Sequence, residues 1–194
     1  DATIVSNIYQ DGKGVITCDK DITYIKTGDR NRLTSLIIPN GVTSIGSLSD
    51  CTNLQKLVIP NSVALYNYHG YFDNCTGELI VNCNIPSPGY AGETLGVFSG
   101  SKFSKVTIGD DVKFIGTRAF LGCNTIQSIH IGKGVNEIGY YTFYNCQGEI
   151  YIDCNIPDSV NTTYGGAFYG SMFSRITIGD NVSTIGEMAF KDIT

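Results

Sequence analysis

The sequence predicts a repeat solenoid, a stack of coils with a parallel β-sheet on one face and short turns, 3-10 or helical segments on the other. Three observations predict it. Short apolar strand-like units recur every 21 to 27 residues, a Val-x-x-Ile-Gly step follows most of them, and an aromatic residue closes the unit. One coil of about 23 residues cannot bury its own apolar side chains, but stacked coils bury those of their neighbours. The fixed order therefore favours a β-rich right-handed coil.

The strand-like units set the period. Their first core positions are Leu36, Leu57, Leu79, Val106, Ile129, Ile150 and Ile176, at spacings of 21, 22, 27, 23, 21 and 26 residues. Periods of about 20 to 29 residues are typical of leucine-rich repeats. Because successive side chains of a strand point to opposite faces, these residues point inward and align from coil to coil.

A second sequence motif, Val-x-x-Ile-Gly, follows most of the strands and predicts the next part of each coil. Val112-x-x-Ile115-Gly116 and Val135-x-x-Ile138-Gly139 are two examples. A large residue then stands three positions before a small or apolar one, in the pairs Leu48/Cys51, Phe72/Cys75, Phe98/Ser101, Phe120/Cys123, Phe143/Cys146, Phe168/Ser171 and Phe190/Ile193. We expect the phenylalanines to form a ladder through the core.

A longer period overlies the short one. The segment 74–86 returns as 145–157, a shift of 71 residues, or three coils. The two long coils also carry matching insertions, 87–97 and 158–167, which we expect on the same edge of the solenoid.

Both ends depart from the repeat. Residues 1–32 are expected to form an N-terminal cap hairpin around Asp11-Gly12, plus one degenerate coil, because Asp-Gly favours a two-residue hairpin turn. Residues 33–194 are expected to hold about seven repeats in one continuous domain. The last unit stops at Thr194, where another strand is due, so we expect a fragment of a longer protein or an end that docks on something.

Composition excludes several function classes. The net charge of -5 disfavours a nucleic-acid partner, whose phosphates require basic residues. No apolar run approaches the roughly 18 residues that a membrane helix needs, so no membrane insertion is expected, and no signal peptide opens the chain. Catalytic motifs are absent, and the only histidines, His69 and His130, stand in different repeat positions. We predict a non-enzyme without cofactor or metal.

Seven cysteines raise the alternative of disulfides or a metal. Cys51, Cys75, Cys123 and Cys146 occupy a slot that elsewhere holds Ser or Ile, which favours a packing role for a small hydrophobic side chain. The first two would be neighbours on adjacent coils, as would the last two. A disulfide within either pair therefore remains an alternative if the chain is in an oxidising environment.

The outward side chains of the strands are the first candidate partner-binding site. One column, the central column, reads Ile37, Val58, Ile80, Thr107, His130, Tyr151 and Thr177. The charged column beside it includes Lys56, Glu78, Lys105, Glu149 and Arg175, where opposite charges on adjacent strands help to hold register. An apolar stripe beside mixed charges is typical of a docking surface, although strand propensity alone also favours β-branched residues there.

Tyrosines on the turns and insertions are the second candidate, because tyrosine combines contact area with a polar tip and suits protein or sugar recognition. They are Tyr66, Tyr68, Tyr71, Tyr90, Tyr140, Tyr141, Tyr144, Tyr164 and Tyr169.

With these residues in view, the chain resembles the BspA-like leucine-rich repeats of bacterial surface proteins. The runs 54–63, 106–123 and 176–190 carry the family's Leu-x-x-Ile-x-Ile-Pro-x-x-Val-x-x-Ile-Gly-x-x-Ala-Phe-x-x-Cys pattern most closely. The two long coils depart from it at Asn82-Cys83 and Asp153-Cys154. The resemblance implies an extracellular or cell-surface location and adhesion to host or matrix proteins.

Three functions follow as hypotheses. The first is a secreted or surface module that binds a host or extracellular-matrix protein. The second is a structural spacer within a longer surface protein. The third is a carbohydrate-binding module, which the absence of tryptophan disfavours and the tyrosines leave open.

Overall fold

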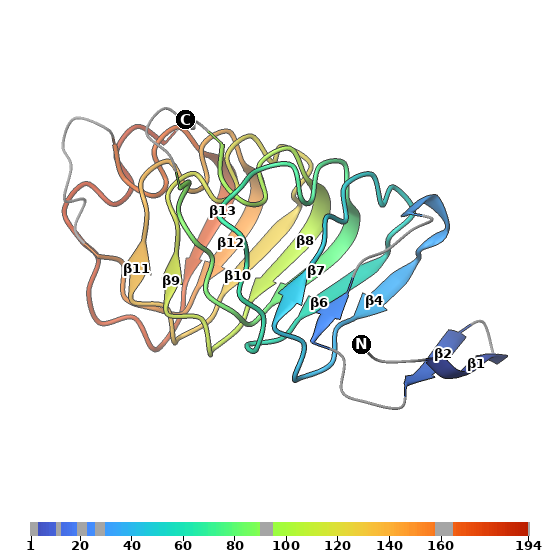
Figure 1. Ribbon diagram of the computed structural model, residues 1–194. Helices are drawn as coiled ribbons and strands as arrows, with labels where there is room; N and C mark the ends of the chain where they lie inside the picture. Colours follow the sequence, from blue (N-terminus) through green and yellow to red (C-terminus); the bar gives the residue numbers. More distant parts are fainter. Residues whose placement is uncertain are drawn as a thin grey trace.

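A seven-stranded parallel sheet forms one face of the solenoid (Figure 1). The computed structural model describes residues 4–10, 13–18, 23–25, 30–89, 95–157 and 165–193. The strands of the sheet are, in order, β4 (Ser35–Ile37), β6 (Lys56–Ile59), β7 (Thr76–Val81), β8 (Lys102–Ile108), β10 (Ser128–Ile131), β12 (Gln147–Ile152) and β13 (Met172–Ile178). Each strand pairs with that of the next coil, which confirms the predicted solenoid.

The register of the sheet matches the predicted core positions. Leu57 lies between Leu36 and Leu79, and the row continues through Val106 to the last coil. Ile129, Ile150 and Ile176 complete this row. The inward side chains of the central strands are buried, so the alternation read from the sequence is confirmed.

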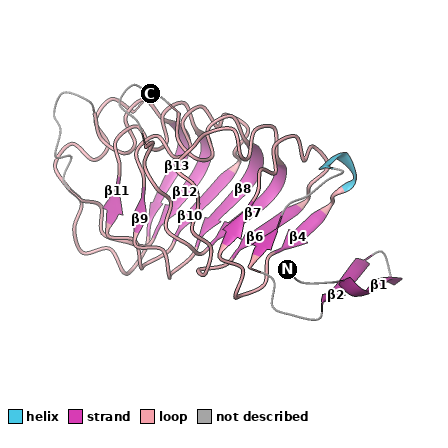
Figure 2. Cartoon of the chain, in the orientation of Figure 1, coloured by secondary structure: helices cyan, strands magenta, loops and turns pink. Residues whose placement is uncertain are grey.

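The opposite side of each coil consists mostly of turns (Figure 2). Two short parallel pairs lie there, β3 (Tyr24–Ile25) with β5 (Ser44–Ile45) and β9 (Phe114–Ile115) with β11 (Glu137–Ile138). The last three of these strands end Val-x-x-Ile steps. In the described part of the chain, the one helical segment is the 3-10 turn η1 (Arg30–Arg32). Turns, rather than helices, therefore close the coils.

The predicted phenylalanine ladder runs through the core. Ring centroids are 4.7 Å apart between Phe72 and Phe98, 5.0 Å between Phe98 and Phe120, and 5.8 Å between Phe120 and Phe143. The ladder continues through Phe168 to Phe190 at 5.4 and 5.2 Å. All of these rings except the last are buried, so each coil contributes one large apolar side chain to its two neighbours.

A column of left-handed residues repeats two positions after each ladder residue. Its members, all Asp, Asn or Gly, have φ between 55° and 80°: Asp50, Asn74, Gly100, Gly122, Asn145, Gly170 and Asp192. These residue types tolerate the left-handed region best. Backbone N–H groups of the column donate to the next coil, as from Asn74 to Gly100 (3.0 Å) and from Asn145 to Gly170 (3.0 Å). The turns are thus hydrogen-bonded from coil to coil, as the strands are.

The cysteine slot has a polar role besides packing. The Cys75 thiol donates to the carbonyl oxygen of Leu48 at 3.0 Å, and the Cys123 thiol to that of Phe98 at 3.1 Å. Cys146 repeats the contact with Phe120 at 3.0 Å. Each of these thiols therefore satisfies a buried carbonyl group of the preceding coil, a role that a hydrophobic side chain of the same size could not fill.

All of the cysteines whose side chains the structure describes are buried free thiols. They are Cys51, Cys75, Cys83, Cys123, Cys146 and Cys154.

The two long coils use asparagine as a clamp. The side-chain oxygen of Asn84 accepts the backbone N–H of Lys113 at 2.7 Å, and that of Asn155 accepts the N–H of Ser183 at 2.8 Å. At the start of these coils Gly77 and Gly148 have φ of 85° and 93°, and a β-carbon at either would collide with the backbone of the preceding coil. The 71-residue period therefore repeats both the asparagine hydrogen bond and the closely packed glycine.

The ends of the chain differ from the central coils. β1 (Ile4–Gln10) and β2 (Lys13–Cys18) pair as an antiparallel hairpin, and Asp11-Gly12 at its turn lies outside the described residues. The cap role of residues 1–32 stays a prediction. Residues 90–94 of the first insertion and 158–164 of the second also lie outside the described part. In the last coil Ile178 and Ile185 are exposed, whereas Ile108 and Ile115 in a central coil are buried.

Candidate functional site

The sheet register places the central column as the sequence predicts. Ile37 pairs with Val58, Val58 with Ile80, and Ile80 with Thr107. His130, Tyr151 and Thr177 continue the column along the remaining strands. Ile37 is 65% exposed, although isoleucine is among the residue types most often buried. The first three members therefore form an apolar stripe on the outer surface of the sheet.

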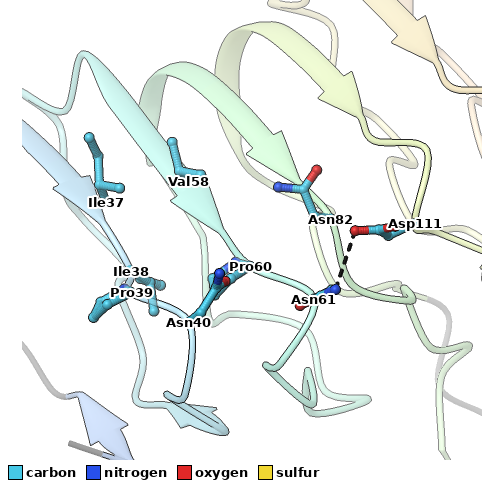
Figure 3. A pocket seen from close by; sticks show the side chains of 9 residues that line it. All are labelled: Ile37, Ile38, Pro39, Asn40, Val58, Pro60, Asn61, Asn82 and Asp111. Atoms are coloured by element: carbon cyan, nitrogen blue, oxygen red, sulfur yellow. Dashed lines mark hydrogen bonds between the residues drawn. The ribbon is translucent and has the colours of Figure 1, made fainter. Parts of the chain in front are cut away.

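A groove opens where this stripe meets the ends of the strands. This strand-end groove has a volume of about 510 Å³, within the range of ligand pockets. Figure 3 shows Ile37 and Val58 at one side of it and polar residues at the other, with Asn61 donating to the Asp111 carboxylate at 3.2 Å. It is lined by Ile37, Ile38, Pro39, Asn40, Val58, Pro60, Asn61, Asn82 and Asp111. An apolar wall with a polar rim suits a side chain of a protein partner.

The charged column forms ion pairs across the strands. Glu78 accepts from Lys105 at 2.9 Å and from Lys56 at 3.2 Å, and Glu149 pairs with Arg175 at 3.5 Å. The hydrogen bond from Lys105, with support from Lys56, lowers the pKa of Glu78 below its ordinary value despite partial burial. The charged column thus presents a carboxylate held between two ammonium groups beside the apolar stripe.

The Glu78 pair predicts a small, pH-dependent loss of stability. Because the folded pKa of Glu78 is lowered, its contribution is present above the ordinary pKa of 4.5 and disappears as the pH falls through the folded value. We expect Glu78→Gln to reduce the free energy of unfolding by about 0.2–1 kcal/mol at pH 7, and by less at about pH 3. Urea unfolding at both pH values measures this, and exposed Glu137→Gln serves as the control. An undiminished difference at the lower pH would contradict the assignment.

His130 and Tyr151 make the other end of the central column aromatic. Their ring centroids are 4.9 Å apart at an interplanar angle of 62°. Loss of hydration, followed in importance by the Asp153 and Asp180 carboxylates, raises the pKa of the Tyr151 phenol. The phenol therefore stays a neutral hydroxyl, which can both donate and accept a hydrogen bond.

Burial disfavours the reactive form of the cysteines whose side chains the structure describes. Burial raises the pKa of Cys75 and Cys83 to about 12, and that of Cys123 and Cys154 to about 11. A nucleophilic cysteine needs the opposite shift, since the thiolate is the reactive form. In the described ranges, no three His, Cys, Asp or Glu side chains come together as metal ligands would. The described residues also include no helix with the length and apolarity to span a membrane.

Only part of the tyrosine set comes together. Tyr140, Tyr141, Tyr144 and Tyr169 form one cluster of ring contacts on adjacent coils, whereas Tyr66 and Tyr71 pair separately at 5.7 Å. Tyr90 and Tyr164 lie outside the described residues. The cluster includes Arg118, which the sequence analysis did not single out, since an arginine alone carries no repeat signal. The guanidinium lies 5.6 Å from the ring centroids of both Tyr140 and Tyr141.

The comparison with family models decides the family. The model of the BspA type leucine rich repeat region matches residues 16–89 and 95–194 in six copies. The chain belongs to the BspA-type leucine-rich repeat family. The first matched range begins at residue 16. Leucine-rich repeats of this family are generally non-catalytic.

One solved structure shows a distant similarity. It is a leucine-rich repeat protein from Bacteroides ovatus, with 14% sequence identity and a TM-score of 0.29 over 98% of this chain and 79% of that one. The family assignment rests on the BspA-type repeats and not on this similarity. None of the curated proteins searched matches the chain.

Proposed function

We propose that this BspA-type solenoid is a non-catalytic binding module whose sheet surface docks a protein partner. The observation that carries the proposal is the apolar stripe of Ile37, Val58 and Ile80, which borders the strand-end groove. A contiguous apolar patch with a polar rim favours protein association. The partner would place an apolar side chain in the groove and cover Ile37.

The charged column supports the same surface. Lys56 and Lys105 flank Glu78 at 3.2 and 2.9 Å, one column away from the stripe. Rim charges of this kind steer partners and fix their orientation more than they add affinity. The family's common association with cell surfaces favours a secreted or surface-exposed setting, with a host or extracellular-matrix protein as the partner.

Binding of the immobilised chain to fibronectin, fibrinogen and other matrix proteins tests the proposal. We expect saturable binding that Ile37→Glu weakens about 30-fold or more, because a charge that the partner must cover costs about 2 kcal/mol or more. Thr177→Glu is the matched control, since it places the same charge at the far end of the same column. It should change the affinity less than about threefold.

Other outcomes would redirect the assignment. Loss of binding on Tyr151→Ala, with Ile37→Glu unchanged, would move the docking site to the aromatic end of the central column. Absence of binding to every matrix protein, by a chain whose circular dichroism shows the folded sheet, would favour the spacer hypothesis over the binding module.

A further inference from the structure

A second concave site lies on the turns that flank the phenylalanine ladder. This tyrosine hollow has a volume of about 400 Å³ and is lined by Arg118, Leu121, Tyr141, Tyr144 and Tyr169. All five side chains are half-buried, so each is fixed by the coils and still presents a surface to the hollow. Its residues come from successive turns and share none with the strand-end groove.

The rings of the hollow are held in a defined arrangement. Tyr144 and Tyr169 are nearly parallel, with centroids 6.3 Å apart at 13°. Tyr141 stands across both, at 5.7 Å and 86° from Tyr144 and at 5.4 Å and 82° from Tyr169. Edge-to-face contacts of this kind are favourable beyond the apolar area that they bury. Three tyrosines from two adjacent coils thus form a compact aromatic cluster that lines the hollow.

The backbone beneath the rings is adapted to them. A β-carbon at Gly170 would collide with the ring of Tyr144, and one at Gly165 with the ring of Tyr169. Glycine at these two positions lets the tyrosine rings lie directly against the main chain. The rings thus have fixed positions before any ligand binds, which reduces the entropic cost of binding.

Two residues of the hollow occupy a backbone conformation that bulky side chains avoid. Arg118 and Tyr141 have φ of 56° and 55°, and their N–H groups donate to Tyr140 and Gly166 of the next coil at 3.0 and 3.1 Å. The repeat imposes the conformation, since Met188 shares it, but glycine would adopt it at lower cost. The left-handed backbone therefore sets the positions of both side chains in the lining of the hollow.

We propose that the tyrosine hollow binds a hexopyranose unit of a carbohydrate chain. A pyranose has an apolar C–H face that packs on an aromatic ring, and hydroxyl groups around its edge. Tyrosine hydroxyls donate and accept hydrogen bonds, so they can meet these groups. The volume lies within the range of small-molecule sites. A proline-rich peptide fits less well, because its extended helix needs an elongated aromatic groove.

Titration with methyl glycosides of glucose, galactose, mannose and N-acetylglucosamine tests the proposal. The chain has no tryptophan, so its intrinsic fluorescence reports its tyrosines, and NMR shifts identify the residues involved. We expect saturable binding of at least one glycoside with a dissociation constant on the order of 1 mM. Tyr169→Ala should weaken it about tenfold or more, and Tyr169→Phe less, because the ring remains.

Tyr66→Ala is the matched control, since Tyr66 belongs to the separate pair with Tyr71, and it should leave the affinity unchanged. The absence of any shift up to about 50 mM glycoside, in a sample whose NMR spectrum is that of the folded chain, would overturn the proposal. So would binding of a polyproline peptide, but of no glycoside, that Tyr169→Ala abolishes. Neither result bears on the sheet-face site, because the two sites share no residue.

Discussion

Phe120→Ala is expected to lower the free energy of unfolding by about 3–5 kcal/mol. The ring is fully buried and lies between Phe98 and Phe143, at 5.0 and 5.8 Å. Removing it leaves a cavity at the middle of the ladder, where the neighbouring coils are fixed by hydrogen bonds on both sides and cannot collapse into the space. Urea unfolding followed by circular dichroism measures the loss.

The end of the ladder supplies the control. Phe190 contacts Phe168 at 5.2 Å but is only half-buried, so Phe190→Ala should cost clearly less than the change in the middle. If Phe120→Ala prevents folding, Phe120→Leu, which retains most of the apolar volume, should fold with a smaller loss. Equal costs at the two positions would show that the coils do not depend on a continuous ladder.

The six buried cysteines are expected to resist alkylation in the folded chain. Burial raises the pKa of Cys75 to about 12 from an ordinary 9.0, which lowers its thiolate fraction at neutral pH about a thousandfold. Each thiol is also out of reach of reagent, since none of the six residues is more than 3% exposed. Peptide mapping after treatment with iodoacetamide, with and without urea, measures labelling at every cysteine separately.

We expect labelling of Cys75 to rise about a thousandfold or more on unfolding, because both the access of the reagent and the thiolate are restored. Labelling of the other five cysteines should rise for the same two reasons. Cys18 lies on a strand whose side chains are outside the described part, so it is read separately. Rapid labelling of Cys123 in the folded chain would contradict the buried slot. A mass lower by two hydrogens for the joined Cys51 and Cys75 peptides would indicate a disulfide instead.

The sheet could be predicted from the sequence because its signals are local and repeated. The spacing of Leu36, Leu57 and Leu79 determines the register, and side-chain alternation then places Ile37 and Val58 outward. The ion pairs of Glu78 follow from the same register. A single strand would leave its register with a neighbour ambiguous. The repeated spacing removes this ambiguity, because the same alignment must hold for every coil.

The features that could not be predicted depend on contacts between turns. The position of Arg118 beside Tyr140 and Tyr141 follows from a left-handed backbone at Arg118 and Tyr141 that neither residue type favours. The thiol of Cys123 reaches the carbonyl oxygen of Phe98 only because the coils stack closely. The residue types at this repeat position indicated a packing role but not this hydrogen bond. The strand-end groove likewise requires Asn61 and Asp111, which are 50 residues apart, to meet.

The asparagine clamps limit how such a chain can grow by duplication. Asn84 and Asn155 each hold the coil that follows, and the side chains of Asn82 and Asp153 occupy the space that a β-carbon at Gly109 or Gly179 would take. A long coil and its successor are therefore a matched pair. A gene rearrangement that joins a long coil to an unrelated neighbour loses both contacts, whereas one that copies the pair intact adds a compatible segment. A duplication that preserves these contacts must therefore include at least two coils.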